Sequence, residues 1–212
     1  MTEKYDKDYF ENGLVMGISC YLNYRWLPEL TIKMAHNIIK YLNIDNKETV
    51  LDYGCAKGYL VKALRILDIE TYGTDISSYA IKNVDPEVRD FCHLMRDTIP
   101  IKFPEYFDWT ITKDVLEHLT EKELNIFLLC SSHITKKCFH IIPLGNTTGF
   151  IIPDYNFDKT HVLAKPIEWW KKKFEKYGWE VLSFEYSVRG IKDNWTQKYP
   201  KGNGFFTLKY GK

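Results

Sequence analysis

Residues 50–58 read Val50-Leu51-Asp52-Tyr53-Gly54-Cys55-Ala56-Lys57-Gly58, a short β-rich run that ends in a glycine turn. A helical pattern follows, with Leu60, Leu64 and Leu67 on one face. In a strand–turn–helix of this kind the backbone approaches a ligand closely. The first turn of the helix also offers free N–H groups and a partial positive charge. This stretch therefore predicts a ligand-binding unit at the end of a buried strand.

Strand and helix patterns alternate on both sides of this stretch. The sequence predicts strands at residues 49–53, 70–75, 91–95, 107–112 and 138–142, and helices at 29–42, 60–67, 77–82, 114–119 and 124–134. A helix at 166–177 and strands at 179–188 and 204–210 complete the chain. This alternation implies a largely parallel sheet with helices on both faces. Because ligands bind outside the carboxyl ends of such strands, we expect the chemistry at residues 53–58, 75–78, 97–98, 112–118 and 143–165.

The acidic residue after the second predicted strand indicates a nucleoside ligand. Asp75 lies 17 residues after Gly58, and a carboxylate at that place can accept two hydrogen bonds from a ribose diol. The glycine turn does not match the dinucleotide fingerprint G-x-G-x-x-G, because Ala56 and Tyr59 stand where that fingerprint has its second and third glycines. The P-loop pattern is absent from the sequence as well.

Residues 50–58 resemble motif I of the class I S-adenosylmethionine (SAM)-dependent methyltransferases: an acidic residue, a glycine two residues later and a second glycine four residues after that. Residues 72–77 are similar to the second motif of that family, and residues 107–109 and 113–119 to its fourth-strand region. The resemblance covers about residues 29–212. It implies an α/β fold with a seven-stranded, Rossmann-like, mostly parallel sheet, helices on both faces and an antiparallel C-terminal strand pair. We expect residues 1–28 to form an N-terminal aromatic arm or lid, and residues 29–212 to form the methyltransferase domain.

The resemblance implies cofactor-binding roles for single residues. Asp52 and the glycine backbone would hold the amino-acid end of SAM, and Asp75 would bind the ribose hydroxyls. Ile76 would pack on the adenine, Asp97 would meet the adenine amino group, and Thr112 and Lys113 would line the methionine side. The expected cofactor-binding residues are Asp52, Gly54, Cys55, Gly58, Asp75, Ile76, Asp97, Thr98 and Lys113. Ala56 stands where the family often has a glycine, and alanine permits close approach of the cofactor if the backbone there is not left-handed.

Two histidines are the expected catalytic bases. Methyl transfer from a sulfonium is an in-line displacement, and an alcohol acceptor must lose its proton. His118 and His161 both fall at predicted carboxyl-end positions, with a packing or capping role as the alternative for each. We expect the aromatic residues, 16% of the chain, to gather at residues 9–26 and 169–206 around the mouth of the cofactor cleft. Trp169 and Trp195 are free to stack on a sugar ring, whereas Trp170 lies on an apolar helical face.

A divalent metal is a further hypothesis. Asp114, Glu117 and His118 share one face if residues 114–119 are helical, and His161 could supply a fourth ligand. This set resembles the metal-dependent branches of the family, which include quinone O-methyltransferases and small-RNA 2′-O-methyltransferases. A cation there would polarise a hydroxyl pair on the acceptor. Those enzymes carry Glu where this chain has Asp114, so ordinary capping and salt-bridge roles are the alternative.

The composition of the chain limits the class of methyl acceptor and the cellular location that we expect. The 29 Lys+Arg and 28 Asp+Glu give a net charge of +1, which excludes a strongly basic nucleic-acid binder and favours a small acceptor. We expect a SAM-dependent methyltransferase that releases S-adenosylhomocysteine and methylates a hydroxyl of a sugar, sugar nucleotide or glycan precursor. The alternatives are a metal-assisted enzyme for a quinone or an RNA 2′-hydroxyl, and a non-catalytic SAM-binding protein. Five cysteines without a C-x-x-C pair, a polar N-terminus and no long apolar run favour a cytoplasmic protein without a transmembrane segment.

Overall fold

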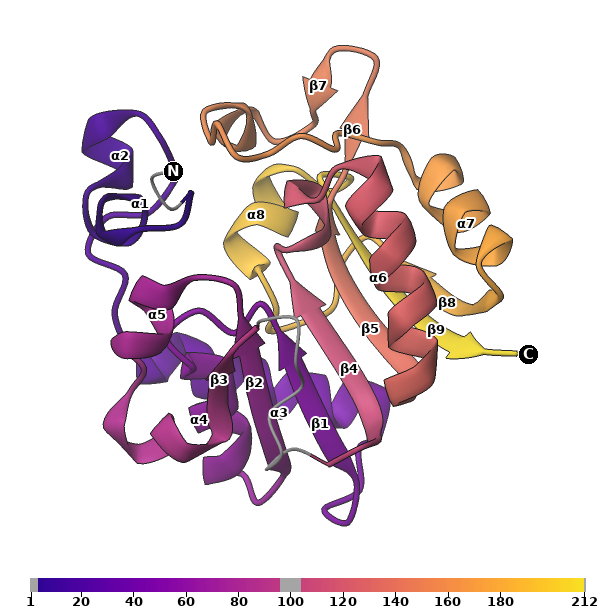
Figure 1. Ribbon diagram of the computed structural model, residues 1–212. Coiled ribbons are helices and arrows are strands. Elements are labelled where there is room, and N and C mark those ends of the chain that lie inside the picture. Colours follow the sequence, from indigo (N-terminus) through magenta and orange to yellow (C-terminus); the bar gives the residue numbers. More distant parts are fainter. Residues whose placement is uncertain (1–3, 96–103, 212) are drawn as a thin grey trace.

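The centre of the molecule is a seven-stranded sheet with the strand order β3-β2-β1-β4-β5-β9-β8 (Figure 1). The computed structural model describes residues 4–95 and 104–211. The strands are β1 (Thr49–Tyr53), β2 (Glu70–Asp75), β3 (Cys92–Leu94), β4 (Phe107–Lys113), β5 (Thr135–Pro143), β8 (Trp179–Glu185) and β9 (Asn203–Tyr210). The first five strands are parallel, with Leu51 opposite Tyr72 on one side and Thr110 on the other. β9 is antiparallel to β5 and β8, so the predicted sheet with its antiparallel C-terminal pair is confirmed.

Helices cover both faces of this sheet, and each face has its own apolar core. α3 (Pro28–Leu42) and α4 (Tyr59–Ile66) pack on one face, and α6 (Glu121–Ile134) and α7 (Ile167–Lys176) on the other (Figure 1). Successive side chains of a strand point to opposite faces, so Phe139 and Ile141 of β5 enter the first core and Cys138 and Ile142 the second. Burial of both faces explains why the central strands have nearly continuous apolar sequences.

Local capping starts the helices at the carboxyl ends of the strands. Ser77 accepts a hydrogen bond from the Ala80 N–H and begins α5 (Ser78–Lys82), as the sequence predicts. Thr120 and Glu123 form a capping box at the start of α6. A 3-10 turn, η1 (Pro86–Phe91), leads into β3. Because these helix starts follow β2 and β4 at the same edge of the sheet, the polar turns of the predicted site lie close together.

The N-terminal segment lies beyond the carboxyl ends of the strands, next to α5 (Figure 1). Within it are two short helices, α1 (Lys7–Glu11) and α2 (Gly13–Met16), as expected for an irregular arm. Tyr9 and Phe10 are buried against Ala80 of α5. The arm also contacts the segment after β5, because the Lys159 N–H donates to the Ile18 carbonyl at 3.2 Å. The arm thus bridges the two sides of the carboxyl edge.

The two long connections at this edge contain structure of their own. The segment after β5 holds a small hairpin, β6 (Gly145–Asn146) with β7 (Gly149–Phe150), and the 3-10 turn η3 (Pro153–Asn156). It then docks beside the segment after β4, because the Val162 and Leu163 N–H groups both donate to the Glu117 carbonyl. The loop between β8 and β9 contains α8 (Asp193–Lys198). These connections bring residues 155–161 and 190–195 over the end of β4.

The predicted helix at residues 114–119 is wrong. Only Leu116–His118 form a helical turn, the 3-10 turn η2. Asp114 has a left-handed backbone with φ of 55°, which interrupts any continuous helix from that residue. Its N–H still donates to the Ile141 carbonyl of β5, so Asp114 extends the sheet before the chain turns. Asp114, Glu117 and His118 therefore do not share one helical face, and helical spacing does not bring them together as one set of metal ligands.

Two further features concern the environment of the chain. Within the described ranges, no helix is long and apolar enough to cross a membrane. All five cysteine thiols are free, so disulfide bonds contribute nothing to the stability of this fold.

Candidate functional site

A cavity of about 600 Å³ opens at the carboxyl ends of β1 and β4. Its size is typical of small-molecule sites, which range over roughly 300–1,000 Å³. The glycine turn contributes Asp52, Gly54, Cys55 and Ala56 to its lining. The segment after β4 and the loop before α7 contribute Lys113, Asp114, His118, Tyr155, Asp158 and His161. The predicted cofactor turn and both predicted base histidines therefore share one cavity.

The glycine turn is held in a conformation that its residue types explain. Gly54 has φ of 85°, and its N–H donates to the Thr74 carbonyl of β2 at 2.8 Å. A Cβ atom at Gly54 would lie 2.4 Å from Cγ2 of Val115, so a larger residue would push the turn away from the segment after β4. Gly58 is the left-handed N-cap of α4. The first turn of this helix thus begins at the cavity, as the sequence predicts.

Asp52 is a buried carboxyl group at the floor of the cavity, with 4% of its surface exposed. Burial and, to a smaller extent, the nearby charge of Asp75 raise its pKa to about 7, against the opposing charge of Lys113. A cationic ligand group placed here would restore the ionised form, because it would supply the counter-charge that burial removes. This is the property expected of a residue that holds the amino group of an amino acid.

Asp75 ends β2 and braces the glycine turn. Its Oδ2 accepts from the Ala56 N–H and its Oδ1 from the Ser77 N–H, each at 2.8 Å. A carboxylate oxygen can accept more than one hydrogen bond. Ile76 follows with 60% of its surface exposed, an unusual state for isoleucine that suits a side chain on which a flat ring packs.

Four other residues expected near the cofactor differ in their positions. Lys113 lines the cavity. Thr112 is fully buried and contacts His140 in the core at 2.8 Å, so its side chain does not reach the methionine side of a cofactor. Asp97 and Thr98 lie outside the described residues.

Ala56 adopts a left-handed backbone with φ of 48°. Alanine was expected to replace glycine here only if the backbone is not left-handed, and this expectation is not met. A left-handed conformation costs a non-glycine residue roughly 1–2 kcal/mol. The hydrogen bond from the Ala56 N–H to Asp75 holds the residue in this state. The turn thus stores strain beside the cofactor side of the cavity.

Replacing Ala56 by glycine is expected to stabilise the protein by about 1 kcal/mol, because the relieved strain exceeds the roughly 0.4–1 kcal/mol that glycine adds to the entropy of the unfolded chain. For a domain of this size, that gain raises the melting temperature by about 2–4 °C. Thermal unfolding followed by circular dichroism measures the shift. A lower melting temperature for the glycine variant would contradict the assigned backbone strain.

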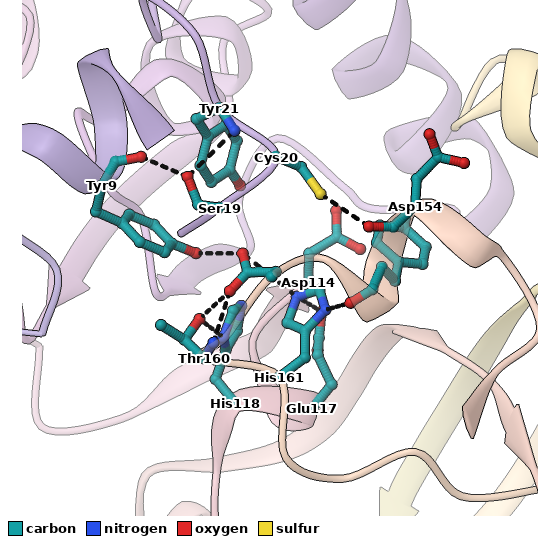
Figure 2. A network of polar contacts seen from close by, with 12 residues as sticks. Tyr9, Ser19, Cys20, Tyr21, Asp114, Glu117, His118, Asp154, Thr160 and His161 are labelled. Carbon is teal, nitrogen blue, oxygen red and sulfur yellow. Dashed lines mark hydrogen bonds and ion pairs between the residues drawn. The ribbon is translucent and has the colours of Figure 1, made fainter. Parts of the chain in front are cut away.

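Beside the cavity lies a compact cluster of three residues, Glu117, His118 and His161 (Figure 2). One ligand-type atom from each lies within 4.8 Å of the others. Glu117 is fully buried, and neither of its carboxyl oxygens has a hydrogen-bond partner among the described residues. Its nearest cation-forming neighbour is His161, with Nε2 3.9 Å from Oε1. Burial and the charge of Asp114 raise the pKa of Glu117 well above its usual value.

Both histidines of this cluster are neutral near pH 7. Burial and, to a smaller extent, the neighbouring His161 lower the pKa of His118 to about 4. Burial also lowers the pKa of His161, against the opposing charge of Asp158. The Nδ1 atom of His161 lies 2.8 Å from the Tyr155 carbonyl, which can only accept, so Nδ1 carries the proton and Nε2 carries the lone pair. His161 therefore has the form that a base or a metal ligand needs.

Asp114 lies apart from this cluster. Its carboxylate forms ion pairs with Lys113, at 2.6 Å, and with Lys192 of the loop before α8. These two ammonium groups hold the pKa of Asp114 well below its usual value in spite of burial. No local sequence pattern identifies Lys192, because its partner Asp114 lies 78 residues earlier in the chain.

Aromatic side chains form much of the cavity wall. Tyr9, Tyr21 and Tyr24 come from the arm, and Tyr155 and Trp195 come from η3 and α8. The rings of Tyr155 and Trp195 are 5.6 Å apart between centroids. The expected gathering of aromatic residues at the mouth is therefore found for the arm and for Trp195.

The two tryptophans of α7 lie elsewhere. Trp169 packs against the second core, so it is not available at the mouth. Trp170 is fully buried, as its position on an apolar helical face predicts.

The arm is also tied to the cofactor turn by a residue pair that the sequence analysis did not identify. Lys57 within the turn forms an ion pair with Glu11 of α1, and its ammonium group also donates to the Tyr24 carbonyl at 2.9 Å. The Tyr79 hydroxyl of α5 donates to the same Glu11 at 3.0 Å. Only 8% of Lys57 is exposed, because the arm covers it.

Comparisons with known proteins agree with this geometry. A family model described as a methyltransferase domain matches residues 51–137. A SAM-dependent methyltransferase from Archaeoglobus fulgidus has a TM-score of 0.59 and 17% identity, over 86% of this chain and 96% of its own. The mitomycin 7-O-methyltransferase has a TM-score of 0.59 and 13% identity, over 94% of this chain and 66% of its own. A small-RNA methyltransferase has a TM-score of 0.60 and 16% identity, over 89% of this chain and 26% of its own.

No curated protein matches the chain significantly. The solved structures establish the shared fold, and the family model covers the part of the chain that carries the site. Residues 51–137 run from β1 into β5, and they include the glycine turn, Asp75 and the segment after β4. The methyltransferase-domain match over residues 51–137 and the shared fold support a class I S-adenosylmethionine-dependent methyltransferase.

Proposed function

We propose that the protein transfers the methyl group of SAM to a hydroxyl group of a small, hydroxyl-rich acceptor such as a sugar, a sugar nucleotide or a glycan precursor. The observation that supports this proposal best is the shared cavity. His118 and His161 line the same cavity as Asp52 and the glycine turn, so a methyl donor and a proton acceptor can meet there. The neutral state of both histidines suits the removal of a hydroxyl proton.

The cofactor would lie on the glycine turn. Asp52 would meet the amino group of SAM, and the backbone of Gly54 and Gly58 and the first turn of α4 would lie along the cofactor. Asp75 and Ile76 would meet the ribose and the adenine, and Asp97 and Thr98 complete the proposed adenine side. Lys113 and the backbone of Cys55 would complete the methionine side. When bound, SAM supplies an electrophilic methyl group on a sulfonium.

The acceptor would lie between the histidine cluster and the aromatic wall. His161 or His118 would take the proton of the acceptor hydroxyl as the bond between the oxygen and the methyl group forms. Tyr155 and Trp195 offer flat surfaces on which a sugar ring can stack. Residues 1–28 would act as the lid over this acceptor, and residues 29–212 as the methyltransferase domain. The contacts of Glu11 with Lys57 and Tyr79 support this division, since they hold the arm across the cavity.

A metal-assisted reaction on a quinone or on an RNA 2′-hydroxyl is the second candidate. The observation that favours it is the convergence of acceptor atoms in the cluster. Glu117 brings two oxygens without partners among the described residues, and the Nε2 lone pair of His161 lies 3.9 Å from one of them. A divalent cation fits such a donor set, and Glu117, His118 and His161 would hold it. Bound there, a cation would polarise an acceptor hydroxyl. Asp114 fits less well because two lysines already neutralise it.

A transfer assay with isotopically labelled SAM separates these possibilities. The acceptors are free sugars, sugar nucleotides, quinols and short RNAs, each tested with purified protein before and after dialysis against a chelator. Atomic spectroscopy gives the metal content of the same samples. The proposal expects a labelled sugar or sugar nucleotide and release of S-adenosylhomocysteine, with activity that survives chelation.

Other results of this assay would indicate one of the two alternative functions. Transfer only to quinols or RNA, lost on chelation and restored by a divalent cation, would establish the metal-assisted reaction in place of the first proposal. Binding of SAM without transfer to any acceptor class would contradict both and indicate a non-catalytic SAM-binding protein.

A further inference from the structure

His118 is the end of a short chain of hydrogen bonds between residues that lie far apart in the sequence (Figure 2). Its Nδ1 atom lies 2.8 Å from the Thr160 hydroxyl oxygen. The same hydroxyl lies 2.5 Å from Oδ1 of Asp158, which also accepts from the Thr160 N–H at 2.8 Å. The side chains of Asp158 and Thr160 are buried, so water does not compete for these contacts.

The positions of the protons in this chain follow from its chemistry. A carboxylate only accepts hydrogen bonds, and a threonine hydroxyl has one proton to donate. The Thr160 hydroxyl therefore donates to Asp158, and its oxygen accepts from His118. His118 then carries its proton on Nδ1, and its lone pair is on Nε2. A neutral imidazole has one ring proton, so the hydrogen bond to Thr160 fixes which nitrogen carries it.

We propose that Thr160 and Asp158 are positioning residues that fix His118 in its Nδ1–H tautomer and so hold the Nε2 lone pair ready for the acceptor hydroxyl. The use of that lone pair rests on the proposed function, whereas the tautomer itself does not. In the transfer step the hydroxyl proton moves to Nε2, the oxygen–methyl bond forms and the sulfur–methyl bond breaks. The sulfonium becomes the neutral thioether of S-adenosylhomocysteine, and the new imidazolium is stabilised through Thr160 by the Asp158 carboxylate.

The N-terminal arm completes this chain. The Tyr9 hydroxyl of α1 donates to Oδ2 of Asp158 at 3.2 Å, so both carboxylate oxygens are held. The ring of Tyr5 packs edge-on against the His118 ring, with 5.7 Å between centroids. The arm thus fixes the orientation of His118 from two sides. Residues that are remote in the sequence, in the arm and in the loop before α7, together determine which nitrogen of His118 is free.

The tautomer can be measured without knowledge of the acceptor. Nuclear magnetic resonance of protein labelled with ¹⁵N in histidine distinguishes Nδ1–H from Nε2–H through the shifts and couplings of the two ring nitrogens, and a His118→Gln variant assigns the signal. We expect the Nδ1–H tautomer for His118 in the wild-type protein at neutral pH. An Nε2–H tautomer would overturn the proposal, whatever the acceptor proves to be.

Thr160→Val removes the hydroxyl while Asp158 keeps its hydrogen bond from the backbone of residue 160. We expect this variant to lose the preference for Nδ1–H and to show kcat about 10- to 100-fold lower, as for other partners that orient a functional histidine, with unchanged SAM affinity. Thr160→Ser should restore both properties. Thr135→Val is the matched control, since Thr135 is also a buried threonine but lies at the start of β5, and kcat should not change.

Failure of the inference and failure of the proposed function give different results. If Thr160→Val binds SAM normally and retains the wild-type tautomer and kcat, Thr160 does not position His118 and the inference is wrong. If no hydroxyl acceptor is methylated, the proposed function fails, while the tautomer measurements on the wild type and the Thr160→Ser variant still decide the inference.

Discussion

Asp52→Asn is expected to weaken SAM binding roughly 10- to 100-fold, because a hydrogen bond between charged groups contributes about 1.5–3 kcal/mol. Asparagine preserves the shape of the carboxyl group but cannot provide a negative charge for the amino group of the cofactor. Isothermal titration calorimetry measures the change. Asp108→Asn is the matched control, because Asp108 accepts hydrogen bonds from Thr49 at the start of β1, and this change should leave the affinity for SAM unaltered.

The same experiment has a pH dependence that identifies the group. Burial raises the pKa of Asp52 to about 7, so below that pH the carboxyl group is protonated and must lose its proton before it can meet a cation. The affinity of the wild-type protein for SAM should therefore be nearly constant above pH 7 and fall about tenfold for each pH unit below it. The Asp52→Asn variant should lose this dependence. A wild-type affinity that stays constant from pH 5.5 to 8 would show that Asp52 does not hold the cofactor.

Glu117→Gln is expected to stabilise the protein and to abolish most of its methyl transfer. Glu117 is buried without a hydrogen-bond partner among the described residues, which costs folding free energy whether the group is ionised or forced to accept a proton. The neutral amide avoids this cost, so we expect roughly 1–3 kcal/mol of added stability in the presence of a chelator. The rate of transfer should fall by about 10²- to 10⁴-fold, because an amide cannot take up and release a proton beside His161 as a carboxyl group can.

The stability that Glu117→Gln adds should depend on pH, and this dependence provides a second measurement. The pKa of Glu117 in the folded protein is raised, so its burial destabilises the fold only above the pKa of the unfolded chain, and the penalty grows as the pH rises toward the folded value. Thermal unfolding should show little difference between Glu117→Gln and the wild type near pH 4 and a higher melting temperature for the variant at neutral pH. Glu180→Gln, an exposed residue on β8, serves as the control. A variant that is less stable and fully active would refute the role of Glu117.

Much of the fold could be predicted because its signals are local. The β-rich run before the glycine turn became β1 at the predicted residues, Thr49–Tyr53, and Ser77 caps α5 as its residue type indicates. Alternation of apolar strands and amphipathic helices then leaves few possible topologies. The position of the cofactor turn follows from that topology, since it lies where β1 meets α4.

The details of the site depended on contacts that no local pattern encodes. The helical spacing of Asp114, Glu117 and His118 suggested one ligand set, but Asp114 has a left-handed backbone and pairs with Lys192 from a distant loop. The connection before α7 folds back onto the Glu117 carbonyl, and this places His161 beside Glu117. Grouping His161 with Glu117 and His118 was therefore possible from residue types, whereas the separation of Asp114 was not.

The chain of Thr160 and Asp158 illustrates the same limit. Both residues stand within three positions of His161, and their sequence indicates only a polar turn. Their contact with His118 spans 42 residues, and the contact of Asp158 with Tyr9 spans 149. Similarly, the left-handed backbone of Ala56 is imposed by its neighbours in the turn, since alanine itself disfavours it.

Calorimetric titration of the purified wild-type protein with SAM and with S-adenosylhomocysteine tests most directly whether the glycine turn and its cavity bind this cofactor. We predict that both ligands bind with one site per chain and compete with each other, and that Asp52→Asn weakens the binding of both. Absence of binding to either ligand by the folded protein at pH 8, where Asp52 is ionised, would contradict the assignment of a SAM-dependent methyl transfer to this site.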